Sequence, residues 1–421
     1  MRHRRPLRAL TALVFGTASF AVVGLSAAAP AGATPGPVTL DSGPSGQPND
    51  VELFGASTAG ILYSVTDIAG GGIEHFFMQP TGGSSTPVPA GIYPSTVAAA
   101  VVGPMIGGFD GVSTFTYTTI TGSASGTSTV PAGATFQTTS ADGYLYSAVP
   151  NGVTAPHIYD VNVTAHTTTD LGAVPGNPAP FTLIASTTGV LVETYATPPA
   201  VQPESLYYLT YTAPGQFTEF TSSVAVQGVP VLGANAAAWI ENPTLSTDES
   251  SFVPADTTVV RIGLDGSNEV RTAIPDAVGV ALTSTLTGVT TQPPPNIPQT
   301  FATMPAAGGA LTPYPIQLPE AAMAFGNSFI ANQNGTPTTA GLYTMPSAAG
   351  PATQLIAAGA QTLRATALAL SPGRAAWVDN GVPAGTWSRP LSTTGLTITP
   401  GTPSVLSSIS DPSDRTPISS S

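Results

Sequence analysis

The sequence has 421 residues, of which 10 are basic and 23 acidic, and its formal net charge is −13. All the basic residues are Arg. Their small number argues against a nucleic-acid partner, because a protein that binds nucleic acid needs a basic surface to neutralise the phosphates. The absence of Cys excludes disulfides, thiolate nucleophiles and Cys-ligated metals, whereas a hydrophobic fraction of 42% argues against a disordered chain.

The N-terminus has the layout of an export signal. An Arg-rich stretch precedes an uncharged apolar run from Ala9 to Leu25, and Ala31-Gly32-Ala33 is a cleavage site of the small-x-small type. We expect a signal peptide at residues 1–33 and a mature protein that is secreted or held in the cell envelope. The alternative is an uncleaved anchor, since the run is near the shortest length that spans a bilayer. The pair Arg4-Arg5 leaves the export route open.

After this segment the chain repeats itself. The string AAWIEN at Ala237–Asn242 returns as AAWVDN at Ala375–Asn380, and TMPAAG at Thr303–Gly308 returns as TMPSAAG at Thr344–Gly350. These offsets fit a period of about 43 residues, close to that of blade-forming repeats. The chain then divides into eight similar units. No later segment is apolar for long enough to enter a membrane once the signal is removed.

Each unit contains four short runs that are typical of strands. The first runs are apolar, as at Thr96–Val102, Phe181–Ala185 and Ala365–Leu370. The second runs follow a turn residue, as at Gly60–Val65, Asp142–Ser147 and Thr188–Glu193. The third runs carry aromatic or bulky residues, as at His75–Phe77, Phe115–Tyr117, Ile158–Tyr159, Leu206–Tyr208, Leu342–Tyr343 and Trp387. The fourth runs are rich in Thr, as at Thr167–Val174 and Glu219–Ser222.

Short runs of β-branched and aromatic residues between turn signals predict an all-β fold. Four strands in about 43 residues match a propeller blade. We therefore predict a single β-propeller over residues 34–409 with eight four-stranded blades, followed by a loose tail at 410–421. Units two (91–131) and six (276–318) have the weakest pattern. The alternatives are seven blades, with one unit shared between the termini, and two β-sandwich domains.

One unit resembles a known family. The segment LALSPGRAAWV at Leu368–Val378 resembles the SPDGRxIAY repeat of TolB-like propellers, which are related in architecture to WD-type propellers, and Trp387–Leu391 follows as the third strand of that repeat. The Asp of the family pattern is absent between Pro372 and Gly373. The resemblance implies the propeller fold and no activity, because propellers host many unrelated functions.

Three connections are longer than the rest, namely 196–204, 243–257 and 291–299. Each separates the second and third strands of its unit, in the consecutive units four, five and six. In a propeller these connections lie side by side on one rim, where binding sites are common. We predict a ligand or partner site on this face. The alternative is a tolerated loop extension, which costs little free energy.

The middle connection and its approach carry four carboxylates, which are the candidate binding residues: Glu241, Asp248, Glu249 and Asp256. Carboxylate oxygens bind Ca²⁺, but the spacing of an EF-hand loop is absent and solvated acids are the simpler interpretation. Metal binding is therefore left open, and we expect no cofactor. The three His residues outside the signal, His75, His157 and His166, form no zinc motif.

The sequence contains none of the nucleophile-elbow, phosphate-binding or dinucleotide-binding motifs. This favours a non-enzymatic binding or scaffolding protein whose partner is a protein or a cell-envelope polysaccharide. One alternative is an extracellular carbohydrate-active enzyme, a glycosidase or lyase, since 23 acids are enough to supply a catalytic pair. Another is a structural envelope protein that carries glycans. Trp239 and Trp377 occupy equivalent positions, where packing between blades is expected ahead of sugar stacking.

Overall fold

A computed structural model describes most of the chain from Asn49 to Ser407. The described residues are 49–57, 59–67, 73–80, 85–89, 92, 100–140, 142–176, 180–194, 204–242, 256–292, 299–318, 323–325, 328–333, 341–346, 353–357, 365–371, 374–379, 385–394, 397–400 and 404–407. The expected signal peptide at 1–33 and the expected tail at 410–421 lie outside them. Throughout this part of the chain the regular elements are strands, and a membrane-spanning helix is not among them.

The strands form eight antiparallel sheets, and each sheet takes its strands from one continuous stretch of sequence. We number the sheets as blades 1 to 8 in chain order. Blade 1 contains β1 (Asn49–Ala56), β2 (Gly60–Asp67), β3 (Ile73–Pro80) and β4 (Thr86–Pro87). Blade 2 contains β5 (Ala100–Val102), β6 (Met105–Phe109), β7 (Thr114–Thr119) and β8 (Ser125–Thr129). Blade 3 contains β9 (Thr135–Thr139), β10 (Gly143–Ala148), β11 (His157–Asn162) and β12 (Thr167–Ala173). Blade 4 contains β13 (Phe181–Ala185), β14 (Gly189–Thr194), β15 (Glu204–Thr210) and β16 (Phe217–Val224).

The second half of the chain continues the same order. Blade 5 contains β17 (Val226–Leu232), β18 (Ala236–Glu241), β19 (Thr258–Gly263) and β20 (Val270–Ala273). Blade 6 contains β21 (Ala277–Leu282), β22 (Leu286–Thr291), β23 (Gln299–Pro305) and β24 (Thr312–Leu318). Blade 7 contains β25 (Met323–Phe325), β26 (Ser328–Gln333), β27 (Gly341–Pro346) and β28 (Thr353–Ala357). Blade 8 contains β29 (Ala365–Ser371), β30 (Arg374–Asp379), β31 (Gly385–Thr394), β32 (Thr397–Pro400) and β33 (Ser404–Ser407), and both β32 and β33 pair with β31.

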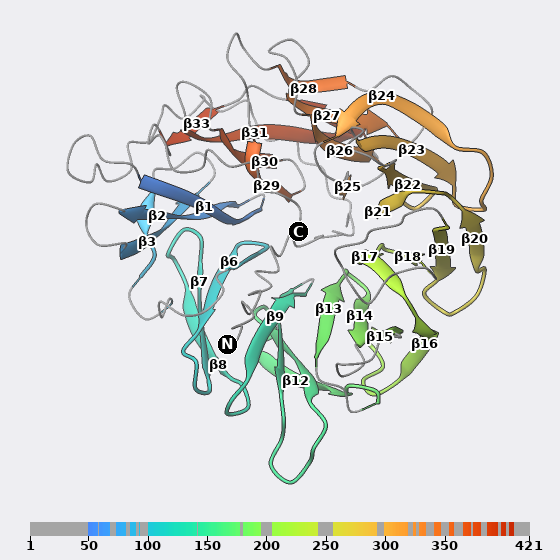
Figure 1. Ribbon diagram of the computed structural model, residues 1–421. Coiled ribbons are helices and arrows are strands. Elements are labelled where there is room, and N and C mark those ends of the chain that lie inside the picture. The colour runs from blue at the N-terminus through green and yellow to red at the C-terminus, as the bar shows by residue number, and fades with distance from the viewer. Residues whose placement is uncertain are drawn as a thin grey trace, which may run out of the picture.

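The sheets radiate from a common axis, with the first strand of each blade on the inside (Figure 1). First strands of neighbouring blades contact one another from β1 to β25, and β29 and β30 contact β1. The protein is therefore an eight-bladed β-propeller. No described sheet combines strands from the two ends of the chain, as the seven-blade alternative requires. The radial order of the sheets likewise rules out two sandwich domains.

Most strand predictions are confirmed. Phe181–Ala185 is β13, and the second runs predicted at Gly60–Val65, Asp142–Ser147 and Thr188–Glu193 overlap β2, β10 and β14. The run predicted at Thr96–Val102 corresponds to β5, which starts at Ala100. Its first residues, 96–99, lie outside the described chain.

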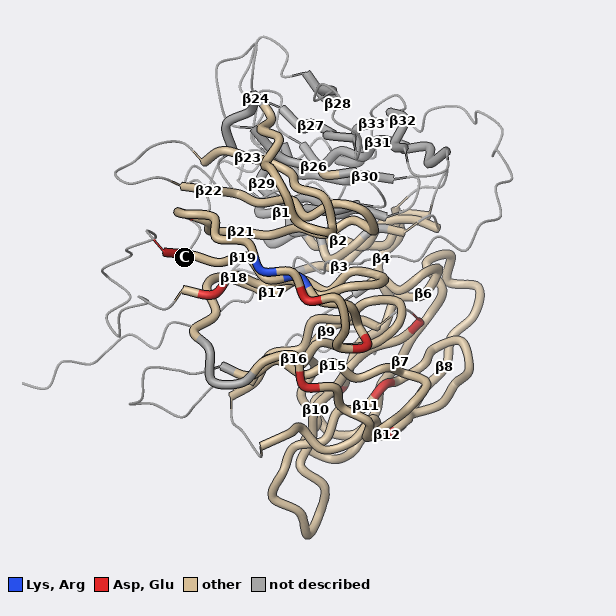
Figure 2. Tube along the Cα trace, turned by 90° about the vertical axis from the view of Figure 1, so that its right-hand side faces the viewer, with Lys and Arg blue, Asp and Glu red and all other residues tan. Residues whose placement is uncertain are grey.

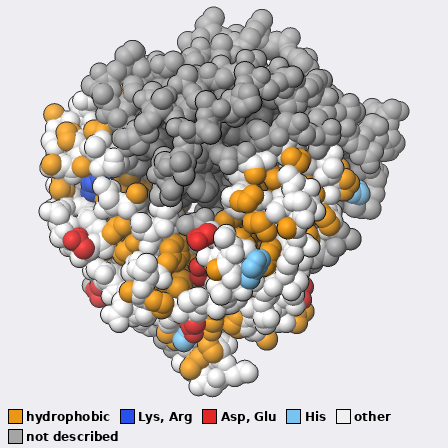
Figure 3. All heavy atoms as spheres, turned by 180° about the vertical axis from the view of Figure 1, so that it is seen from behind, with side chains coloured by type: hydrophobic (Ala, Val, Ile, Leu, Met, Phe, Trp, Pro, Cys, Tyr) orange, Lys and Arg blue, Asp and Glu red, His pale blue; other side chains and the backbone are white. Residues whose placement is uncertain are grey.

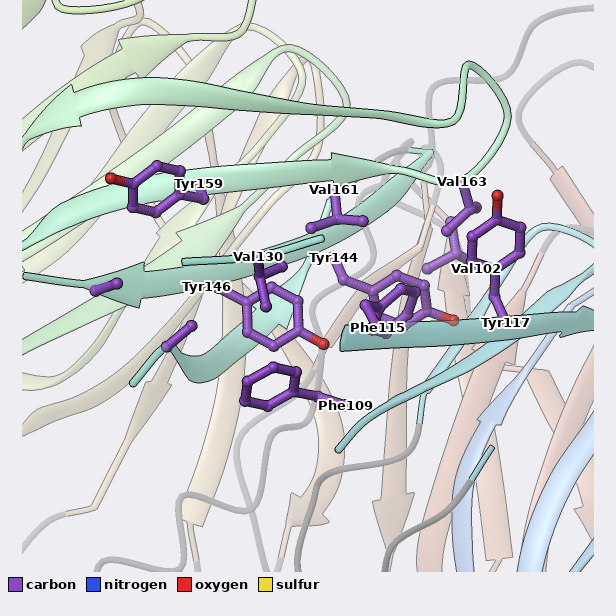
Figure 4. Close-up of a cluster of buried hydrophobic side chains, with 12 residues drawn as sticks. Val102, Phe109, Phe115, Tyr117, Val130, Tyr144, Tyr146, Tyr159, Val161 and Val163 are labelled. Atoms are coloured by element: carbon purple, nitrogen blue, oxygen red, sulfur yellow. The ribbon is translucent and has the colours of Figure 1, made fainter. Parts of the chain in front are cut away.

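Hydrophobic clusters fill the spaces between blades. The cluster between blades 2 and 3 is aromatic and joins Phe109 and Phe115 to Tyr144 and Tyr146 (Figure 4). The ring centroids of Phe115 and Tyr144 are 4.5 Å apart, and those of Phe109 and Tyr146 are 5.3 Å apart. Similar clusters join blades 1 and 2, 3 and 4, 4 and 5, and 5 and 6. A single blade cannot bury either face, so the ring supplies the core that each sheet lacks.

Two glycines explain why units two and six have a weak sequence pattern. In blade 2 the ring of Phe115 on β7 lies against Gly107 on β6, where an added Cβ would be 2.0 Å from Phe115 Cζ. In blade 6 a Cβ at Gly288 on β22 would be 2.6 Å from Cζ of Phe301 on β23. In both blades a third-strand ring occupies the space of a second-strand side chain. The apolar run of the second strand is therefore interrupted, although the sheet is complete.

A buried Arg ties blade 5 to blade 6. Arg261 on β19 is 6% exposed, and its guanidinium group donates to the carbonyl oxygens of the turn between β21 and β22. The acceptors lie 3.1–3.3 Å away and are the backbone oxygens of Thr283, Ser284 and Leu286 and the Oγ1 atom of Thr287. Burial lowers the pKa of Arg261. Figure 2 shows how sparse charge is, with two Arg segments close together near β19.

Candidate binding face

The strand order assigns the connections to two opposite faces. Because neighbouring strands are antiparallel, the connections between second and third strands share one face with the links between blades. We call this face the insertion face. The turns between first and second strands lie on the opposite face, and all of them are short. The three long connections predicted from the sequence follow β14, β18 and β22, so the prediction that each separates the second and third strands of consecutive blades is confirmed.

The predicted set of long connections was incomplete. In blade 3, residues 149–156 connect β10 to β11. This connection is longer than the one formed by residues 292–298, which connects β22 to β23 in blade 6. The connection formed by residues 334–340 in blade 7 has the same length as the one formed by residues 292–298. The segment 149–156 contains Pro150, Asn151 and Gly152, residue types that are equally common in short turns. Long connections between second and third strands thus extend from blade 3 to blade 7, and residues 242–257 in blade 5 form the longest of these.

The longest connection has a rigid, buried polar base. Asn242, at its start, is 1% exposed and donates through Nδ2 to Gln227 Oε1 at 2.8 Å. Gln227 Nε2 in turn donates to the carbonyl oxygen of Ala277 in blade 6 at 2.8 Å. Thr257, at the end of the connection, accepts from the backbone N–H of Ala277 at 3.0 Å and donates to the carbonyl oxygen of Ile274. Both ends of the connection are therefore fixed at the junction of blades 5 and 6.

Glu241 is the predicted site residue whose surroundings are best described. Its Oε1 atom accepts a hydrogen bond from Trp239 Nε1 at 3.1 Å, and its Oε2 atom pairs with Arg271. The side chain of Glu241 is 12% exposed and that of Arg271 is 49% exposed. Arg271 also pairs with Glu269 at 2.8 Å. Arg271 thus balances the charge of Glu241, and a ligand of Glu241 would compete with this pair.

The other predicted carboxylates are less defined. Asp256 is exposed at the end of the longest connection, next to the buried Thr257. Asp248 and Glu249 lie outside the described residues. The binding role of all four carboxylates therefore stays a prediction.

Trp239 belongs to the core, as expected. It is 1% exposed and stacks on Phe220, which stacks on Tyr208. The three rings are nearly parallel and cross from blade 4 into blade 5. Trp239 therefore packs between blades and offers no face to a sugar. The side chain of Trp377 lies outside the described part.

The inner strands carry little charge. Among the described first strands, Asp and Glu occur only in β1, at Asp50 and Glu52, and Lys, Arg and His occur in none. Val229 on β17 is 69% exposed, and the register of β17 on β18 breaks around it. Figure 3 shows the same composition on the surface, where uncharged and apolar atoms dominate the described part.

A few titratable side chains line the edges of the blades. At the β6–β7 turn on the insertion face, Asp110 Oδ1 accepts from the backbone N–H groups of Val112, Ser113 and Thr114 at 2.8–2.9 Å. The Thr114, Val112 and Ser113 hydrogen bonds lower the pKa of Asp110 and keep it ionised. His157 pairs with Asp170 at 2.9 Å. Within the described chain no three His, Asp or Glu side chains are grouped closely enough to hold a metal ion.

No protein-family model matches the chain, and no curated protein matches it in sequence. Among solved structures, it is similar to the β-propeller domain of the trilobed protease from Pyrococcus furiosus, with 9% identity, a TM-score of 0.44 and coverage of 74% of this chain and 98% of that one. The likeness is one of fold. Oligogalacturonate lyase in complex with manganese is also similar, with 11% identity, a TM-score of 0.45 and coverage of 79% and 95%. An acylaminoacyl peptidase from Pyrococcus horikoshii matches with 6% identity, a TM-score of 0.48 and coverage of 81% of this chain and 51% of the peptidase, so the chain spans about half of that protein.

Proposed function

We propose that this protein is an exported binding or scaffolding module that holds a partner on the insertion face, over blades 3 to 6. The supporting observation is the connection 242–257, which starts and ends on the buried base formed by Gln227, Asn242 and Thr257. A rigid base that presents a long polar connection is the arrangement from which proteins build recognition sites. Neighbouring blades present further long connections on the same face.

The chemistry of the connection indicates the partner class. It is rich in Ser, Thr and Pro and carries Asp248, Glu249 and Asp256, with no basic residue. Such a surface repels phosphates and offers hydrogen-bond acceptors and hydroxyls. A protein segment without excess negative charge, or a neutral cell-envelope polysaccharide, fits this chemistry.

The test replaces residues 244–254 by a short Gly-Ser linker and keeps the buried Asn242 and Thr257 in place. We expect a folded protein, judged by circular dichroism and a thermal melt, that no longer pulls down its partner from the envelope fraction of its host and no longer co-sediments with isolated wall polysaccharide. Ser123→Glu, an exposed change on the opposite face, is the matched control and should bind normally. Unchanged binding by the folded linker variant would contradict the proposal.

Of the carbohydrate-active enzymes, a glycosidase requires a pair of carboxylates that flank the scissile bond. The described inner strands offer acids only from β1, at Asp50 and Glu52. Binding is therefore better supported than glycoside hydrolysis. Intact mass of the protein from its host separately tests the envelope-protein alternative, because attached glycans would add to the mass of the chain.

We further propose that residues 1–33 are removed during export. The Arg-rich start, the apolar run and the Ala31-Gly32-Ala33 triplet support this. N-terminal sequencing of the protein recovered outside the cytoplasm should begin at Thr34. A start at Met1 in a membrane-bound fraction would instead show an uncleaved anchor.

A further inference from the structure

The junction between blades 3 and 4 combines an apolar centre with an acidic edge. Leu145, Ile158 and Leu171 of blade 3 pack against the inner strands of blade 4. Side chains alternate along β11, so Asp160 projects to the same side as Ile158, towards blade 4. Asp160 lies on the end of the junction away from the insertion face, where the short turns meet.

The Asp160 carboxyl group is largely buried and has one strong donor. Ser140 Oγ donates to Asp160 Oδ1 at 2.7 Å. A second carboxylate, Asp142, is close by and accepts from Asn162 Nδ2 at 2.9 Å. From blade 4, Tyr211 packs into the same junction, and its buried hydroxyl has no hydrogen-bond partner.

Within the described chain, no cationic side chain is among the groups that act on Asp160. Among the described residues, Asp142 of the same blade acts on Asp160, and Asp160 in turn acts on Tyr211 of blade 4. The Arg side chains with described contacts, Arg261 and Arg271, both belong to blade 5, and His157 on β11 pairs with Asp170. An ionised Asp160 is therefore stabilised only by the Ser140 hydrogen bond, and it lies beside the negative charge of Asp142 in an apolar contact between two sheets.

We propose that Asp160 makes the junction between blades 3 and 4 respond to pH. With a neutral carboxyl group the two blades close on each other, and with an ionised one the junction loosens. The device lies on the opposite face from the proposed binding site and acts through the packing of the ring. It does not depend on the identity of the partner.

The direction of the response follows from linkage. Burial raises the pKa of Asp160 to about 6, with Asp142 adding to the rise and the Ser140 hydrogen bond opposing it. The unfolded chain keeps the ordinary value of 3.8. Between these values the folded state holds a proton that the unfolded state releases, so stability rises as the pH falls from about 7 to about 4. A carboxylate stabilised by a cation would respond in the opposite direction.

The backbone supplies a local reporter of this junction. The N–H group of Gly215 in blade 4 donates across the junction to the carbonyl oxygen of Leu171 in blade 3 at 2.7 Å. We would measure hydrogen exchange at Gly215, corrected for the intrinsic rate, between pH 4.5 and pH 8. The wild type should lose protection by about thirtyfold over this range, the factor that pKa values of about 6 in the closed state and 3.8 in the open state imply between pH 4.5 and pH 8.

Three variants decide the outcome. Asp160→Asn should keep the acid level of protection at every pH. Ser140→Ala removes the opposing hydrogen bond and should move the midpoint to higher pH, which keeps the test decisive if the Asn variant folds poorly. Asp142→Asn, the matched control, should retain the transition with a slightly lower midpoint. Parallel pH profiles of the wild type and Asp160→Asn, an unmoved midpoint in Ser140→Ala, or loss of the transition in Asp142→Asn would each overturn the proposal.

Discussion

Replacing Arg261 by Met tests how the ring is held together between blades 5 and 6. Met keeps most of the apolar stem and removes the guanidinium group, which donates to three backbone oxygens and one hydroxyl of blade 6. Two acceptors keep other donors, because Leu286 O also accepts from Thr283 N, and Ser284 O from Asn235 Nδ2. The oxygen of Thr283 has no other donor among the described contacts.

The magnitude follows from these losses. An unsatisfied buried carbonyl costs about 1–3 kcal/mol, and hydrogen bonds from a charged donor contribute about 1.5–3 kcal/mol each. Relief of the buried charge, which already lowers the pKa of Arg261, offsets part of this. We expect Arg261→Met to lower the free energy of unfolding by about 2–4 kcal/mol. Arg261→Lys should recover little of it, since an ammonium group cannot reach several carbonyls as the planar guanidinium does.

Urea denaturation of the mature protein, followed by Trp fluorescence and circular dichroism, measures the effect. Arg271→Met is the matched control, because its half-exposed pair with Glu241 contributes at most about 1 kcal/mol. A loss in Arg261→Met no greater than that in Arg271→Met would refute the role of the buried group. Full stability of Arg261→Lys would show that charge alone, without the hydrogen-bond geometry, holds the junction.

Three further changes have defined expectations. Gly107→Ala forces the ring of Phe115 out of place, so the free energy of unfolding should fall by about 1–3 kcal/mol, as measured by the urea midpoint. Tyr146→Phe removes a buried hydroxyl that has no partner, so it should leave the thermal midpoint unchanged or raise it, and a marked fall would contradict this. Glu241→Gln keeps the acceptor for Trp239 and removes the ion pair with Arg271. The free energy of unfolding, measured by urea denaturation, should therefore change by less than about 1 kcal/mol.

The fold was predictable because its signal is local. Alternating apolar residues and turn residues define each strand, and the repeated AAWIEN and AAWVDN strings placed Trp239 and Trp377 on equivalent second strands, β18 and β30. The pattern weakened in blades 2 and 6, where the second and third strands pack differently. At Gly107 and Gly288 a neighbouring ring replaces the expected side chain, and the strand loses its apolar run.

The candidate site was harder to predict because its base joins distant residues. Gln227, Asn242 and Ala277 are linked by hydrogen bonds across two blades, and no spacing in the sequence marks them. Glu241 was predicted as a candidate binding residue, but Arg271, two strands away, pairs with it. Arg261 gave no signal either, since a lone Arg in the strand TVVRIG is ordinary until its acceptors in blade 6 are known.

The completion of blade 8 by its own strands bears on how this molecule can evolve. Where a strand from one terminus is built into the sheet of the other, the pairing of the two termini closes the ring, and the terminal repeats cannot be duplicated, deleted or opened without disturbing that pairing. Here β29 and β30 meet β1 as complete neighbours. A duplication or deletion of one repeat in the gene would therefore add or remove a whole wedge without orphaning a strand, and new termini could be placed at other links between wedges.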